Sequence, residues 1–208
     1  MSILSVTASC NSNPENDNYK TKNAIGCKND FSGAIYKSVS SDAPQLSAKN
    51  SIVIENTSER ILYEKSAHAQ VAMASTTKIM TALVVIEKCN LSDIVTVSKY
   101  AASIGGSTIN LRKGEQLSVE ELLYGLMLES GNDAATALAE HTAVSVENFC
   151  VLMNQRAQTA GAKNTNFTSP HGLDNEKHYT TAYDLALITK EALKNEVFSN
   201  IVKTKTIS

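Results

Sequence analysis

The first regular pattern along the chain is a pair of short, mainly apolar runs between residues 51 and 65. Ser51-Ile-Val-Ile-Glu-Asn56 predicts a strand, Thr57–Arg60 a turn and Ile61–Lys65 a returning strand. Apolar runs of this length joined by a short polar turn are typical of a β-hairpin. We therefore expect the ordered part of the chain to begin near Ser51.

Apolar residues at helical spacing dominate the part that follows. Ile79–Ile86 is almost wholly apolar, which predicts a helix buried on most sides, and this run is far too short to span a bilayer. Ser118-Val-Glu-Glu121 is a capping box before a further helix, with serine at the N-cap position and glutamate three residues later. Helices are also predicted over 133–141, 145–161 and 181–195.

The order of the predicted elements indicates the α+β class, because strands come first and mostly helices follow. Two shorter runs, 94–97 and 107–111, predict strands joined by a loop at Gly105-Gly106. We take residues 43–208 as one domain. Residues 1–42 are predicted to be a flexible leader, because the chain from residue 9 onward is rich in Ser, Asn, Lys and Asp without a sustained period.

The leader contains one processing motif. Val6-Thr7-Ala8 has the small-residue spacing of a signal-peptidase site, but only five residues precede it and none is Lys or Arg. An export signal needs a charged start and an apolar run of about 7–15 residues. The export signal is therefore incomplete in this chain, and a signal-peptide remnant and a chance match both stay open.

Composition narrows the class of function. The 208 residues are 42% hydrophobic and carry 19 Lys+Arg against 21 Asp+Glu, which gives a formal net charge of -2. Such a balance disfavours a nucleic-acid binder that relies on a basic face and a polybasic membrane binder. It fits a globular domain with a sizeable core.

The four cysteines do not form a recognisable metal motif. Cys10, Cys27, Cys89 and Cys150 include no C-x-x-C pair, and no histidine cluster lies near them, so no zinc site is expected. Cys89 and Cys150 fall in apolar helical patterns and are interpreted as buried free thiols. A bridge between Cys10 and Cys27 stays open.

The first candidate for chemistry is Ser75-Thr-Thr-Lys78, which has the form S-x-x-K. Positions i and i+3 of a helix lie on the same face, so Lys78 can reach the hydroxyl of Ser75. A serine is a weak nucleophile unless a base takes its proton, and burial can keep a lysine neutral enough to be that base. The alternative interpretation is a helix-capping Ser75 and an exposed Lys78 in the first turn.

A second motif, Ser130-Gly-Asn132, lies downstream between two predicted helices. The Ser130 hydroxyl could relay a proton to a leaving group, and the Asn132 amide could hold a substrate carbonyl or the lysine. The alternative is a helix stop and restart with Asn132 as N-cap. In this order, S-x-x-K and S-x-N are two of the three elements of the penicillin-recognising serine enzymes.

These motifs and their surroundings resemble the D-alanyl-D-alanine carboxypeptidases, the low-molecular-mass penicillin-binding proteins of peptidase family S11. The resemblance covers about residues 43–208. Its segments are Met73–Ala82, Ala101–Thr108, Leu122–Leu128, Ser130–Ala135, Ser169–Asp174 and His178–Leu185.

The resemblance implies a penicillin-binding-protein/β-lactamase-like transpeptidase fold and a serine carboxypeptidase of the cell wall. It implies that Ser75 attacks the penultimate D-Ala of a peptidoglycan stem peptide and forms an acyl-enzyme that water hydrolyses. Lys78 would be the general base, Ser130 the proton relay and Asn132 a substrate-binding residue. β-Lactams would acylate Ser75, and no metal or other cofactor is expected.

The third family element, K-T-G or K-S-G, is not among these 208 residues. We therefore expect the chain to contain the helical part and the N-terminal hairpin, truncated before the K-T-G element, with the C-terminal sheet strands and the family's membrane-anchoring helix missing. The resemblance places family members in the extracytoplasmic cell envelope. An inactive remnant or a peptidoglycan-binding pseudoenzyme is the alternative function.

Two further residues are interpreted as structural. Asp184 is expected to be the N3 acid of a capping box opened by Thr181, and His171 is expected to shape a loop. β-Lactamases share the serine chemistry but usually need an added deacylating Glu. The sequence does not place one near Ser75, so this reading ranks below the carboxypeptidase.

Overall fold

The structure, a computed structural model of the chain, describes residues 3–8, 44–173 and 175–205. Its strands are β1 Ile3–Ala8, β2 Asn50–Glu55, β3 Ile61–Lys65, β4 Ile94–Thr96 and β5 Gln116–Ser118. Its helices are α1 Thr77–Lys88, α2 Val119–Leu128, α3 Asn132–Ala143, α4 Val146–Thr159, α5 Ala182–Leu193 and α6 Glu196–Lys203. Two 3₁₀ turns, η1 Ala74–Thr76 and η2 Ala101–Ser103, complete the described elements.

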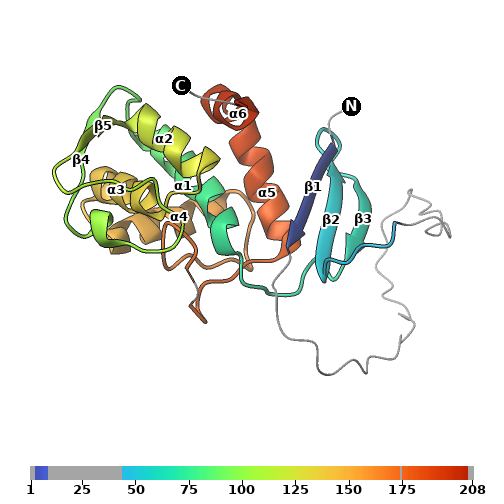
Figure 1. Ribbon diagram of the computed structural model, residues 1–208. Coiled ribbons are helices and arrows are strands. Elements are labelled where there is room, and N and C mark those ends of the chain that lie inside the picture. Colours follow the sequence, from blue (N-terminus) through green and yellow to red (C-terminus); the bar gives the residue numbers. More distant parts are fainter. Residues whose placement is uncertain (1–2, 9–43, 174, 206–208) are drawn as a thin grey trace.

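An antiparallel sheet of β1, β2 and β3, in that order, lies at one end of the molecule (Figure 1). Helix α5 packs between this sheet and the helical part. Ile52 and Ile54 of β2 pack with Ala182 and Ala186 of α5, as the period of two along a strand requires when one face is covered. The predicted hairpin is confirmed, with a register shift between Val53 and Ile54.

Strand β1 differs from the prediction of a leader over residues 1–42. Residues 3–8 pair with β2 along its whole length, from Ile3 opposite Glu55 to Ala8 opposite Asn50. The leader prediction is therefore wrong for this stretch, because a pairing between segments far apart in the sequence leaves no local signal. Residues 9–42, with Cys10 and Cys27, lie outside the described residues.

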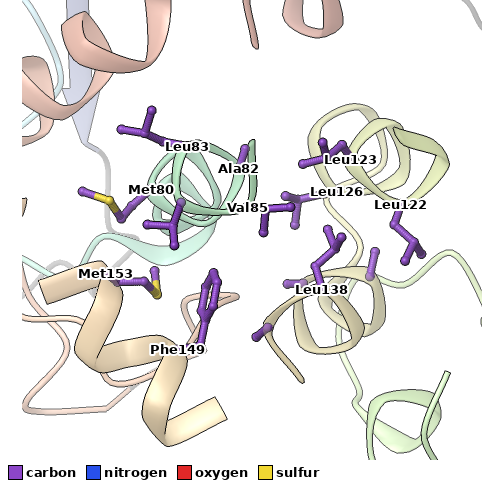
Figure 2. Packing of buried hydrophobic residues seen from close by; sticks show 14 of the residues in the cluster. Met80, Ala82, Leu83, Val85, Leu122, Leu123, Leu126, Leu138, Phe149 and Met153 are labelled. Atoms are coloured by element: carbon purple, nitrogen blue, oxygen red, sulfur yellow. The ribbon is translucent and has the colours of Figure 1, made fainter. Parts of the chain in front are cut away.

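The core of the helical part is built around α1, as the apolar run in the sequence predicted. Figure 2 shows α1 side chains facing those of α2, α3 and α4. The labelled side chains are Met80, Ala82, Leu83, Val85, Leu122, Leu123, Leu126, Leu138, Phe149 and Met153. Fully burying a side chain of the size of leucine or phenylalanine stabilises the fold by about 1.5–3 kcal/mol, so this cluster fixes the position of α1.

The capping box before α2 is confirmed. The Ser118 hydroxyl accepts a hydrogen bond from the Glu121 N–H at 3.2 Å, and the Glu121 carboxylate accepts one from the Ser118 N–H at 2.8 Å. The box predicted at Thr181 is only half formed. Thr181 caps the Asp184 N–H, but the Asp184 carboxylate instead accepts from the Asn164 N–H and the Thr165 hydroxyl.

The strand predicted over 107–111 is absent, and β4 pairs instead with β5. The N–H groups of Ile109 and Leu111 donate to the carboxylate of Asp133, at 3.1 and 3.0 Å, so they are not used in a ladder. Helix α6 was not predicted. It is short, and Phe198 and Ile201 are its buried residues.

Both cysteines in the described part of the chain are free thiols. Cys150 is buried, and burial raises the pKa of its thiol to about 11, so the thiol is inert at neutral pH. Cys89 is only half-buried and lies 3.3 Å from the Thr142 hydroxyl. Of the helices that the structure describes, none has the length and apolar character to cross a membrane.

Candidate active site

Ser75 lies in the 3₁₀ turn η1, immediately before α1, and its side chain is exposed. Met73 on one side is buried in the core, and the apolar face of α1 follows on the other. Because the turn lies between buried Met73 and a buried helix, its hydroxyl is accessible in a fixed place. This is the arrangement that a nucleophile needs.

Lys78 is almost completely buried, with 2% of its surface exposed. Its ammonium group donates to the Ser75 hydroxyl at 3.3 Å, to the Asn132 side-chain oxygen at 2.8 Å and to the His171 carbonyl at 3.0 Å. All three N–H donors of an ammonium are therefore used. The alternative of an exposed first-turn lysine is wrong.

Burial lowers the pKa of Lys78 from 10.5 to about 8. None of the ion pairs among the described residues includes Lys78, so no carboxylate restores its charged form. Its partners are a hydroxyl, an amide and a backbone carbonyl, which are all neutral. The lysine is therefore poised to accept a proton near neutral pH.

Asn132 joins Lys78 to a neighbouring loop. Its side-chain oxygen accepts from Lys78, its side-chain nitrogen donates to the Gly105 carbonyl at 2.8 Å, and its backbone N–H donates to the Ser107 carbonyl at 2.7 Å. Helix α3 begins at Asn132 with Gly131 at the N-cap position. The interpretation of Asn132 as an N-cap residue is therefore wrong.

Ser130 lies in the turn that precedes Asn132, with a positive φ of 57°. Its hydroxyl oxygen is buried and has no hydrogen-bond partner among the described residues. The structure thus brings Ser75, Lys78 and Asn132 into direct hydrogen-bonding contact, and leaves the Ser130 hydroxyl without a bond to any of them.

The segment around His171 forms one wall of the site. Its carbonyl accepts from Lys78, and its ring Nδ1 accepts from the Leu173 N–H at 3.2 Å. Burial, together with the charge on Lys78 and a smaller effect of His178, lowers the pKa of His171 to about 4, so its ring is neutral at pH 7. These contacts agree with a loop-shaping role.

Asp133 is a site residue that the sequence did not reveal. Its carboxylate is 2% exposed and holds the N–H groups of Ile109 and Leu111. The loop that carries Gly105 is thereby fixed against the start of α3. These two partners are backbone groups more than twenty residues away, and backbone groups have no signature in the sequence.

A hollow with a volume of ≈ 280 Å³ opens beside the serine. Ser75, Asn132 and His171 line it, and Gly106 and Gly172 form parts of its wall. No carboxylate is among its described lining residues. The titratable groups placed for acid–base work are the neutral His171, which lines the hollow, and Lys78, whose ammonium nitrogen lies 3.3 Å from the Ser75 hydroxyl oxygen. The arrangement suits nucleophilic attack by a serine on a carbonyl, with a lysine base.

Comparison with known proteins gives one consistent answer. The family model for D-alanyl-D-alanine carboxypeptidase, peptidase S11, matches residues 37–207. The D-alanyl-D-alanine carboxypeptidase DacF of Bacillus subtilis (strain 168) is 44% identical over 162 residues, which is 76% of this chain and 42% of that protein.

Solved structures show the same fold. The D-alanyl-D-alanine carboxypeptidase DacD from Francisella tularensis superposes with a TM-score of 0.71 at 36% identity, over 74% of this chain and 39% of that one. Penicillin binding protein 5 from Haemophilus influenzae gives 0.70 at 37% identity, over 73% and 46%. The chain thus has the penicillin-binding-protein fold and spans less than half the length of these three relatives.

Proposed function

The chain belongs to the D-alanyl-D-alanine carboxypeptidase family, peptidase S11, and on that premise we propose that its site removes the terminal D-alanine of peptidoglycan stem peptides. The reaction proceeds through an acyl-enzyme on Ser75. The observation that carries the proposal is the buried Lys78, whose ammonium group is held by the Ser75 hydroxyl, the Asn132 amide and the His171 carbonyl.

In the first step the Ser75 hydroxyl gives its proton to neutral Lys78 while its oxygen bonds to the carbonyl carbon of the penultimate D-alanine. With the pKa of Lys78 at about 8, about a tenth of the lysines are neutral at pH 7. The distance of 3.3 Å between the two side chains is long for a hydrogen bond, and catalytic hydrogen bonds often tighten only when substrate binds.

Collapse of the tetrahedral intermediate breaks the peptide C–N bond, and the leaving amine of the terminal D-alanine must receive a proton. Ser130 is proposed to relay that proton from Lys78, because its hydroxyl is buried in the adjoining turn without a partner of its own. Water then hydrolyses the ester, which restores Ser75. The Ser75 N–H is proposed as one donor to the oxyanion.

Asn132 is proposed to bind the substrate amide. Its side-chain nitrogen has two N–H donors, and the Gly105 carbonyl takes one of them. The other can meet a substrate carbonyl at the edge of the hollow. Because a β-lactam presents a reactive carbonyl in place of the scissile bond, we also propose that β-lactams acylate Ser75, and that the protein works in the cell envelope.

The proposal is tested by release of D-alanine from a synthetic peptide that ends in D-Ala-D-Ala. The expected result is release by the wild type and none by Ser75→Ala, while Ser103→Ala keeps the wild-type rate. Ser103 is the matched control, because it is also an exposed serine in a 3₁₀ turn and its hydroxyl bonds only the Tyr100 carbonyl. Equal release by Ser75→Ala would rule out Ser75 as the nucleophile, and no release by a folded wild type would leave the binding-only alternative.

A further inference from the structure

The residue before the nucleophile has an unusual backbone conformation. Ala74 has a φ of +45°, which is uncommon for a residue with a Cβ and persists only where surrounding contacts enforce it. Its carbonyl oxygen accepts hydrogen bonds from the N–H of Thr77 and from the Thr77 hydroxyl, the latter at 2.7 Å. Thr77 is therefore the residue that holds the Ala74 carbonyl.

The Thr77 hydroxyl is itself held by His178. The two side chains are 0% and 3% exposed, and the Thr77 oxygen lies 2.7 Å from His178 Nε2. A hydroxyl has one proton, and Thr77 gives it to the Ala74 carbonyl, so the histidine has to be the donor in this bond. On the far side of the ring, His178 Nδ1 accepts from the Thr168 N–H at 3.0 Å, which fixes the neutral tautomer with its proton on Nε2.

The bonds thus run in one direction, from the Thr168 N–H through His178 and Thr77 to the Ala74 carbonyl. In a trans peptide the C=O and the following N–H point in opposite directions, and the described chain has no cis peptide. Holding the Ala74 carbonyl therefore sets the direction of the Ser75 N–H.

From this chain of hydrogen bonds we propose that His178, acting through Thr77, is a positioning residue that orients the Ala74–Ser75 peptide for the reaction. It does not touch substrate. It fixes the direction of the proposed oxyanion donor and the place from which the Ser75 hydroxyl attacks.

The packing on the other side of the Ala74 carbonyl supports this assignment. A Cβ added to Gly172 would lie 1.9 Å from the Ala74 oxygen, so the 171–173 segment packs directly against it. The His178 ring is kept in place by an edge contact with Phe167, with ring centroids 5.8 Å apart. The peptide is thus enclosed by a glycine on one side and held by Thr77 on the other.

The inference rests on the proposed function for its kinetic readout, which is the rate of acylation by a fluorescent penicillin. The variants are chosen by geometry. His178→Gln places a side-chain N–H close to where the histidine Nε2 lies, so it can still donate to the Thr77 hydroxyl. His178→Asn has a shorter side chain, whose amide reaches only to the position of Nδ1. Thr77→Val removes the hydroxyl and keeps the shape, and Thr77→Ser keeps the hydroxyl.

We expect Thr77→Val and His178→Asn each to slow acylation by about 10- to 100-fold, in line with the cost of a small misplacement of reacting groups. Because both changes break the same chain of bonds, the double variant should be slower than the slower single one by no more than about twofold. His178→Gln and Thr77→Ser should stay within about threefold of wild type. The matched control is Thr189→Val, since the Thr189 hydroxyl donates to the Leu185 carbonyl of its own helix at 2.7 Å and is not part of the chain of bonds from Thr168 to Ala74.

The second readout does not depend on activity. The amide cross-peak of Ser75 in a ¹H–¹⁵N spectrum should move in Thr77→Val and His178→Asn and stay in place in His178→Gln and Thr189→Val. If the folded wild type is not labelled, the proposed function fails while the cross-peak still decides the inference. Three results would overturn the positioning role of His178. They are an unmoved Ser75 cross-peak in His178→Asn, equal acylation rates for His178→Asn and His178→Gln, and effects of the two single changes that multiply in the double variant. Should Thr77→Val not fold, the comparison of Asn with Gln at position 178 decides.

Discussion

Acylation of Ser75 should rise with pH and level off above about 8, because in the proposed mechanism only neutral Lys78 takes the serine proton. With a pKa of about 8, the neutral fraction grows from about a tenth at pH 7 to about nine tenths at pH 9. The rate constant for acylation should therefore grow about tenfold over this interval and then reach a plateau. An ordinary lysine with a pKa of 10.5 would give a rise of about 100-fold, with no plateau by pH 9.

The assay is the second-order rate constant for labelling by a fluorescent penicillin between pH 6 and 9.5, corrected for hydrolysis of the free β-lactam. Lys78→Arg is the control, because arginine stays protonated over this range and should show no such rise. A wild-type profile that is flat, or that still climbs steeply at pH 9, would refute the assignment of Lys78 as the base.

The same shift predicts how folding stability changes with pH. The folded pKa of Lys78 lies below its unfolded value, so the unfolded chain binds more protons between pH 8 and 10.5, and stability rises with pH across that window. Below pH 8 the buried ammonium lowers the free energy of unfolding in full. Raising the pH through 10.5 deprotonates it and recovers up to about 3 kcal/mol. Urea unfolding of wild type and Lys78→Met at pH 7 and 10 isolates this contribution. Equal pH slopes for the two proteins would contradict it.

Three further substitutions test the fold around the site. Gly172→Ala should slow acylation by about 100-fold, because its Cβ would meet the Ala74 carbonyl at 1.9 Å; an unchanged labelling rate would show that this contact is not needed. Phe149→Ala should lower the free energy of unfolding by about 3–5 kcal/mol in urea titration, since the ring is fully buried, and a loss below about 1 kcal/mol would contradict the described core. Val144→Gly should raise the free energy of unfolding by about 0.5–1 kcal/mol, because Val144 has a φ of +68° and is 88% exposed. A loss of stability in this variant would argue against backbone strain at this helix end.

The sequence predicted the elements whose signals are local. The hairpin over 51–65, the buried helix that became α1 and the capping box at Ser118 depend on neighbouring residues, and the structure confirms them. The S-x-x-K and S-x-N motifs also lie side by side in the structure, because Lys78 donates hydrogen bonds to both Ser75 and Asn132.

The features that sequence reasoning missed depend on distant backbone groups. The His171 carbonyl that holds Lys78 and the N–H groups that hold Asp133 belong to the main chain, which looks the same at every position. Strand β1 is fixed by pairing with a segment far along the chain. The run over 107–111 ends in alternating polar and apolar residues, as a strand does, but the amides of Ile109 and Leu111 bond the Asp133 carboxylate instead.

The role of Ser75 as nucleophile is tested most directly by locating the site of covalent attachment of penicillin, by mass spectrometry of the digested protein. One penicilloyl adduct is expected, on Ser75, in the wild type and in Ser103→Ala, and none in Ser75→Ala. An adduct on another residue, or no adduct on a chain shown by circular dichroism to be folded, would contradict the claim that Ser75 and Lys78 form a working nucleophile and base.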